Sequence, residues 1–248
     1  MAAISIVNNQ AGNHGAGSAT YALPYNVTNG STLVWGVVQY KASSSPLAAA
    51  PTKSAGTATI NPAVLDATLE WNNAGYYLRH EIYRIPITGD GTLTIAVNNV
   101  PTSVIWGCVE TLNIDAIDGT LYTNTGNGTA EATASMTGHA GGLMFEIAAE
   151  DYAPVSHTAL SDQSIYENAN ASYMTGQSQY RLPAGTESVA ISATLGATGH
   201  WGALGIVYKP VPAAAITGTA TSSITEADVV TGGKTIIITL TGTTLVAN

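Results

Sequence analysis

Charged side chains are scarce in this 248-residue chain: only 9% of its residues are Asp, Glu, Lys or Arg, against about 25% in an average globular protein. Only 7 residues are Lys or Arg, the formal net charge is −9, and the few cations do not cluster along the sequence. A surface that binds nucleic acid or anionic lipid needs clustered Lys and Arg side chains. The composition therefore argues against both kinds of partner.

Long apolar runs and cysteine pairs are also missing. No window approaches the ~18 uninterrupted apolar residues of a membrane-spanning helix, so we expect no membrane insertion. The first ten residues, MAAISIVNNQ, do not match a secretory signal, because no cationic segment precedes an apolar core. The single cysteine, Cys108, stands in the apolar run VIWGCV. It allows no intrachain disulfide, and we expect a buried structural thiol.

Short strand-type runs are abundant instead. Residues 32–40 (TLVWGVVQY), 76–85 (YYLRHEIYRI) and 142–149 (GLMFEIAA) are rich in β-branched and aromatic residues and lie between segments of Gly, Asn, Ser and Pro. No stretch carries an apolar stripe of helical period over more than about two turns. Because 45% of the residues are hydrophobic, disorder is a poor interpretation. The sequence predicts an all-β protein.

One pattern occurs twice. Residues 83–109 are YRIPITGDGTLTIAVNNVPTSVIWGCV, and residues 180–204 are YRLPAGTESVAISATLGATGHWGAL. Each copy begins with Tyr-Arg-aliphatic-Pro, passes through a Gly-bearing turn and ends on Trp-Gly with an apolar run. Internal similarity of this kind predicts a β-sandwich of two related halves. Arg84 and Arg181 recur at one place in the pattern, and we expect each to form an inter-strand hydrogen bond or ion pair.

The chain divides into three parts by composition. Residues 1–20 form an arm or first strand, residues 21–211 the sandwich, and residues 212–248 a short C-terminal β tail after a Pro-Ala linker. The tail is too short to bury a core alone. It is therefore expected to pair with another chain, to pack on the sandwich or to open an Ig-like module. The assembly contacts would come from the apolar run Ile236, Ile237, Ile238 and Leu240, which would be an aggregation hazard as a free edge.

The order of these strand sequences resembles that of jelly-roll-type β-sandwich domains in phage virion proteins and bacterial surface proteins. Residues 104–118 (VIWGCVETLNIDAID) and 200–210 (HWGALGIVYKP) belong to this resemblance, which covers about residues 18–210. Residues 216–248 resemble a segment that joins domains and opens an Ig-like module in phage tail, fibre and head-surface proteins. The resemblance implies an antiparallel, jelly-roll-like fold.

The same resemblance implies a non-enzymatic structural protein of a phage virion. Such a protein would decorate the capsid or belong to the tail or fibre, would leave the cell on lysis, and would have itself and other virion proteins as partners. The alternative is a carbohydrate-binding adhesion module that recognises host-surface glycans. A structural repeat of a bacterial surface protein is the third interpretation.

Catalytic patterns are missing from the sequence. The histidines are scattered, no Gly-x-Ser-x-Gly elbow is present, and no spacing selects a glycosidase-type pair among the strand carboxylates Glu70, Glu81, Glu110, Glu146 and Glu150. We therefore predict that the protein is not an enzyme.

Aromatic residues give the candidate glycan site. Trp35, Trp106 and Trp201 each precede Gly in an apolar strand and are predicted core residues. Trp71 differs, because it precedes Asn72-Asn73 and lies near Tyr76 and Tyr77. Trp71, Tyr76 and Tyr77 therefore form the predicted carbohydrate platform.

Asp115 and Asp118, in the sequence DAIDG, are the best candidates for Ca²⁺ ligands, since this cation prefers carboxylate and carbonyl oxygens. The pattern is not that of an EF-hand loop, and the same residues are typical of a tight turn. The turn is the favoured interpretation, and no cofactor is required by the sequence.

Overall fold

The computed structural model describes residues 2–14, 19–41, 50–73, 75–97, 103–150, 157–159, 164–170 and 174–212. Within these ranges all of the regular secondary structure is β-strand, which confirms the prediction of an all-β protein. The chain divides into one compact unit, Met1–Val211, and a second unit, Pro212–Asn248. The predicted assembly residues Ile236, Ile237, Ile238 and Leu240 lie outside the described residues.

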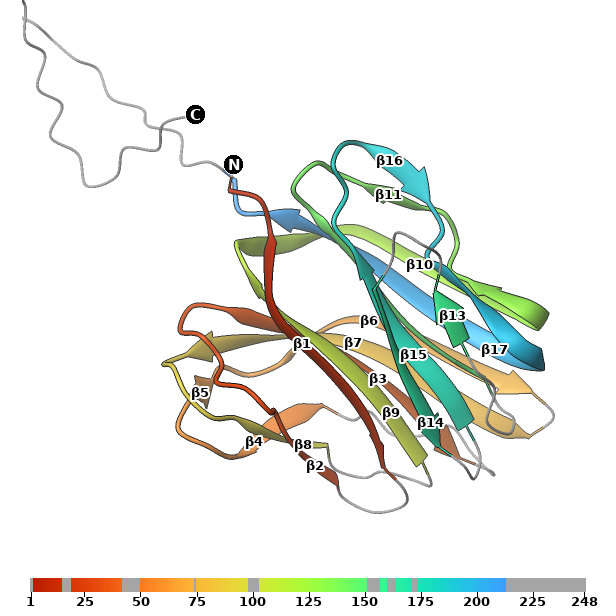
Figure 1. Cartoon of the computed structure of the whole chain (residues 1–248), viewed down its shortest axis with the longest axis horizontal. Coiled ribbons are helices and arrows are strands. Elements are labelled where there is room, and N and C mark those ends of the chain that lie inside the picture. The colour runs from red at the N-terminus through yellow and green to blue at the C-terminus, as the bar shows by residue number, and fades with distance from the viewer. Residues whose placement is uncertain are drawn as a thin grey trace, which may run out of the picture. The chain divides into compact units, whose positions relative to one another are not determined.

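Two antiparallel sheets form a sandwich (Figure 1). The first sheet has the order β1 (Ser5–His14), β9 (Ser103–Leu112), β3 (Thr32–Lys41), β7 (Tyr76–Thr88) and β6 (Val64–Asn73). The second has the order β10 (Ile114–Ala132), β17 (Ser192–Pro210), β12 (Leu143–Glu150), β15 (Met174–Arg181) and β14 (Ser164–Asn170). Two short strands extend them: β5 (Thr59–Ile60) pairs with β7, and β13 (His157–Ala159) pairs with β17.

Each half of the chain builds one sheet, and both sheets have the same internal order. Along each half, the main strands are β1, β3, β6, β7, β9 and then β10, β12, β14, β15, β17. In space the order is first, fifth, second, fourth, third in both sheets. The prediction of two related halves therefore agrees with the topology. A jelly roll instead shares the strands of its Greek keys between two sheets, so the jelly-roll part of the prediction is not confirmed.

A small sheet covers the outer face of each large sheet. Over the first lie β2 (Ala19–Ala22), β8 (Thr94–Val97) and β4 (Pro51–Ala55); beside the second lie β11 (Met136–Gly138) and β16 (Glu187–Val189). Antiparallel strands usually alternate apolar and polar residues because one face meets water. Here β9 and β12 are buried on both faces, which accounts for the continuous apolar runs in the sequence.

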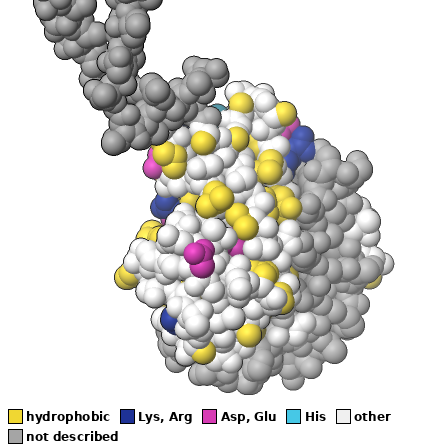
Figure 2. Space-filling view, turned by 60° about the vertical axis from the view of Figure 1, so that its left-hand side comes forward, with side chains coloured by type: hydrophobic (Ala, Val, Ile, Leu, Met, Phe, Trp, Pro, Cys, Tyr) yellow, Lys and Arg dark blue, Asp and Glu magenta, His cyan; other side chains and the backbone are white. Residues whose placement is uncertain are grey.

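The surface reflects the scarcity of charge. On the face in Figure 2 most described side chains are uncharged, a few Lys, Arg, Asp and Glu stand apart, and hydrophobic side chains gather near the middle. The large hydrophobic side chains that are exposed in the described chain are Val7, Val64, Leu65, Leu121, Leu182 and Val211.

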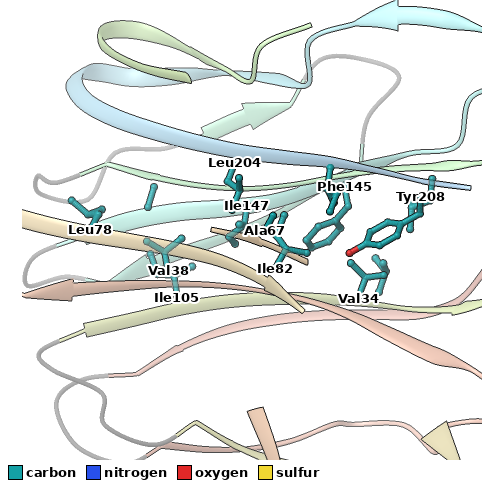
Figure 3. Packing of buried hydrophobic residues seen from close by; sticks show 14 of the residues in the cluster. Val34, Val38, Ala67, Leu78, Ile82, Ile105, Phe145, Ile147, Leu204 and Tyr208 are labelled. Carbon is teal, nitrogen blue, oxygen red and sulfur yellow. The ribbon is translucent and has the colours of Figure 1, made fainter. Parts of the chain in front are cut away.

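An inner apolar cluster holds the two large sheets together (Figure 3). Val34, Ile82 and Ile105 of the first sheet are fully buried. They belong to one cluster with Phe145 and Tyr208 of the second sheet, which are also buried. A buried side chain of this size contributes roughly 1.5–3 kcal/mol by leaving water, so this cluster is a main source of the sandwich's stability.

The repeated Trp-Gly pair has one role in both halves. Trp106 and Trp201 are buried on the outer faces, Trp106 stacked on Trp35 with ring centroids 4.5 Å apart. The following glycines face the other sheet: a Cβ on Gly107 would overlap Ser178, and one on Gly202 would lie 3.1 Å from Cε1 of His80. Glycine at 107 therefore leaves room for Ser178 of the other sheet, and a Cβ at 202 would require the buried His80 ring to shift. The predictions of three buried tryptophans and a buried Cys108 are confirmed.

The two repeated arginines form ion pairs, as predicted. Arg84 donates from Nε and Nη2 to Asp66 at 2.6 and 2.9 Å, and from Nη1 to the carbonyl oxygen of Asp115 at 2.6 Å. The Tyr208 hydroxyl donates to the same Asp66 carboxylate at 2.9 Å. Arg181 pairs with Glu187 in the same two-bond geometry. The Asp66 group thus joins strands of the first sheet to β10 and β17 of the second.

Candidate functional site

A small cavity lies at the predicted aromatic platform. It has a volume of about 170 Å³ and is lined by Glu70, Trp71, Asn72 and Tyr77. Trp71 packs against the inner cluster and is paired with Leu78, whereas Tyr77 is paired with Asn72. Successive side chains in a strand point to opposite faces, so Trp71 and Tyr77 reach the cavity from opposite faces of the sheet. The Tyr76 side chain lies outside the described part of the structure.

Charged groups continue from this cavity along the outer face of the first sheet. The Arg79 guanidinium pairs with Glu70 through Nη1 and donates from Nε to Glu81 at 2.9 Å. The Gln39 side-chain amide donates to Glu81 at 3.4 Å. Glu81 is fully buried, while half of the Glu70 side chain is exposed. The cavity therefore combines an aromatic side chain, an amide and an ion pair, which is the kind of lining that can bind a polar sugar.

The predicted Ca²⁺ ligands lie within strand β10, where its pairing with β17 is irregular. Asp118 accepts hydrogen bonds from the Thr120 amide at 2.9 Å and from the Tyr122 hydroxyl at 3.1 Å, one on each carboxylate oxygen. The next residue, Gly119, has φ 91°, a conformation that glycine adopts readily, and it lies where the register between β10 and β17 shifts. The backbone carbonyl of Asp115 accepts from Arg84. These contacts belong to a bulged stretch inside β10, so the tight turn that the sequence favoured is not formed there.

A second group of polar residues lies on the outer face of the second sheet, and sequence reasoning did not find it. We call it the Glu/Gln compartment: Glu131 on β10, Glu146 on β12, and Gln177 and Gln179 on β15. All four are fully buried. The Gln177 amide donates to Glu131 at 2.6 Å and the Gln179 amide to Glu146 at 2.8 Å. Burial and the nearby Glu131 charge raise the pKa of Glu146 well above its usual value.

The end of β10 brings Glu131 to this place. Residues 130–132 pair with residues 192–194 of β17, and the adjoining Leu195 packs on Ala148, Trp201 and Ala203 of the outer face. The two hydrogen-bonded pairs join residues that are 46 and 33 positions apart in sequence. Only the folding of β10 and β17 back over the sheet brings the four together, so spacing in the sequence carries no signal for them.

Other candidate features are weaker. A larger cavity of about 470 Å³ lies between residues 50–53 and 60–63 and has mainly small and apolar lining residues. In the ranges that the structure describes, no three His, Cys, Asp or Glu side chains come together as metal ligands. The same ranges hold no helix that is long and apolar enough to cross a membrane.

Comparison with known proteins gives no relative: no family model, no curated protein and no solved structure matches this chain.

Proposed function

We propose that this protein is a non-enzymatic structural subunit of a phage virion, which displays its β-sandwich on the particle surface and assembles through its C-terminal tail. The observation that carries the proposal is the division of the chain at residue 211, between a compact sandwich and a second unit. That second unit contains the run TIIITL at residues 235–240, whose β-branched residues favour a strand. An added strand supplies backbone hydrogen bonds and buries apolar side chains, which is a common mode of subunit association.

The sandwich itself supports a display role. Its strands bury apolar side chains on both faces, and its arginines are engaged in ion pairs with Glu70, Glu81, Asp66 and Glu187. Most side chains on its surface are uncharged, as Figure 2 shows for one face. A rigid, weakly charged domain of this kind suits a surface that must remain soluble while the tail makes the specific contact.

The test is the mass of the full chain in solution, measured by light scattering during size exclusion. We expect an oligomer, and we expect the variant Ile236→Ser/Ile238→Ser to be a monomer, because these two residues share one face of the expected tail strand. Leu182→Ser, at an exposed residue of the sandwich, is the control and should remain oligomeric. A monomeric wild-type protein that never cofractionates with particles would contradict the proposal.

Glycan binding is the second candidate function, because the structure brings Trp71 and Tyr77 to one cavity with Glu70 and Asn72. We expect a glycan-array hit whose affinity falls about tenfold in Tyr77→Ala, a loss of about 1.4 kcal/mol. Tyr77 is a better choice than Trp71, which also packs on the inner cluster. Thr52→Ala, at an exposed residue of β4, should bind as the wild type does. Equal binding by Tyr77→Ala would remove this site from consideration.

A further inference from the structure

Two fully buried glutamates of this protein are held in very different ways. Glu110 accepts three hydrogen bonds: from the Thr28 amide at 2.6 Å, from the Ser31 hydroxyl at 2.7 Å and from the Asn8 side-chain amide at 2.8 Å. Donors thus reach both of its carboxylate oxygens, as a buried ionised carboxylate requires. Glu110 shows what a structural carboxylate looks like in this fold.

Glu146 does not meet that requirement. Its Oε2 accepts one hydrogen bond, from Gln179. Among the described residues, no donor reaches its Oε1 or the side-chain carbonyl oxygens of Gln177 and Gln179, although all three atoms are fully buried. Leaving such groups without a partner costs roughly 1–3 kcal/mol each. Several buried acceptor oxygens in one compartment therefore call for a partner that accepts lone pairs, which a cation does.

The charge of the compartment points in the same direction. Glu131 and Glu146 are close enough for the charge of one to oppose ionisation of the other. Within the described chain, the ion pairs of Arg79, Arg84 and Arg181 are made with other carboxylates, and none is made with Glu146. Two ionised carboxylates that are buried this close together repel each other, and a divalent cation bound between them would remove that repulsion.

We propose that the Glu/Gln compartment is a calcium-binding site, in which Glu131 and Glu146 provide carboxylate oxygens and Gln177 and Gln179 provide carbonyl oxygens. Two carboxylates balance one divalent charge. Ca²⁺ accepts a flexible shell of about 6–8 oxygens, amide carbonyls included, whereas Mg²⁺ demands an octahedral shell and tends to keep its waters. The bound ion would join β10, β12 and β15 and so hold the end of β10 against the second sheet.

The calcium site is tested on the full chain, first stripped of metal with a chelator and then titrated with CaCl₂ at pH 7.5. We expect one ion per chain by calorimetry and, at about 100 times Kd, a rise in Tm of roughly 5–10 °C. Glu146→Gln should abolish the rise. Glu110→Gln, which alters an equally buried glutamate, should retain it, as should Asp118→Asn at the pair of aspartates that the sequence suggested.

Because Glu146→Gln could impair folding, Gln179→Met is the second variant. It removes one proposed carbonyl ligand without changing the charge, and we expect it to weaken calcium binding at least tenfold. A wild-type protein whose Tm and heat signal do not respond to calcium would overturn the proposal and leave a protonated Glu146 as the neutralising group. A calcium response that survives both Glu146→Gln and Gln179→Met would also overturn it, because the ion would then bind elsewhere.

Discussion

An Asp66→Ala variant is expected to lose about 3–5 kcal/mol of its free energy of unfolding, because it leaves the Arg84 guanidinium without a carboxylate at a largely buried position. Only 2% of the Asp66 side chain and 22% of the Arg84 side chain are exposed. The same carboxylate also accepts from the Tyr208 hydroxyl of the opposite sheet. The substitution therefore removes an ion pair within the first sheet, between β6 and β7, and a hydrogen bond to the second sheet. Urea unfolding followed by tryptophan fluorescence measures the loss.

The second half of the chain supplies a matched control for Asp66. Arg181 donates to Glu187 through Nε and Nη2, both at 2.8 Å, so the pair has the geometry of Arg84 with Asp66. Its side chains are 20% and 28% exposed, however, so water reaches both partners. Pairs of this kind are worth about 1 kcal/mol or less. We expect Glu187→Ala to cost no more than that.

A double variant separates the charge from the packing at this place. In Asp66→Ala/Arg84→Met no buried charge is left, and an apolar side chain of similar length replaces the guanidinium. We expect this protein to be more stable than Asp66→Ala alone. Replacing both partners of a buried ion pair leaves no charge uncompensated, whereas replacing one partner leaves the other charge buried without a counterion. Equal losses in Asp66→Ala and Glu187→Ala would contradict the idea that the Asp66 group ties the sheets together.

The sequence predicts the all-β class and the two related halves of this protein, because both produce patterns among residues that are close together in the sequence. Continuous apolar runs such as residues 32–40 and 142–149 indicate buried strands, and the repeated Trp-Gly indicates equivalent places in two halves. The runs do not say what covers each face. Both sheets have small outer sheets beside them, and a run buried on both faces carries no alternation from which the connectivity could be read.

The Tyr-Arg-aliphatic-Pro repeat shows how far a sequence pattern reaches. Tyr83 belongs to the outer cluster of the first sheet, whereas Tyr180 packs on the inner cluster. Equivalent residues of the repeated pattern thus have their side chains on opposite faces of the sheet in the two halves. The face of a residue depends on the register of its strand, and a shift by one position reverses it. Ion pairs at both arginines were predictable from residue type, but their burial was not.

The candidate sites divide in the same way. Trp71 and Tyr77 are near each other in sequence, so a local pattern predicts a common place, although not the opposite faces from which they reach the cavity. The Glu/Gln compartment draws on three strands and depends on β10 and β17 folding back over the second sheet. No pattern among neighbouring residues in the sequence indicates that these three strands come together.

A pH dependence is expected from His80, which is fully buried between the sheets beside Gly202. Burial lowers its pKa from 6.5 to about 4, and nearby backbone carbonyl groups of Gly202 and Leu69 offset the change only in part. Between these two pH values His80 is protonated in the unfolded chain but neutral in the folded chain. The folded state therefore loses stability as the pH falls from 6.5 to about 4, and none of this loss is present above pH 6.5.

The expected loss is about 3 kcal/mol at pH 4, since one unit of pKa difference corresponds to about 1.4 kcal/mol. The measurement compares urea unfolding of the wild type and of His80→Gln at several pH values between 4 and 7. Carboxylates titrate in both proteins, so the difference between the two curves isolates His80. We expect the difference to change by about 3 kcal/mol in favour of the variant as the solution is acidified. Parallel curves would mean that His80 accepts its proton in the folded state, and hence that water enters between the sheets at the second Trp-Gly pair.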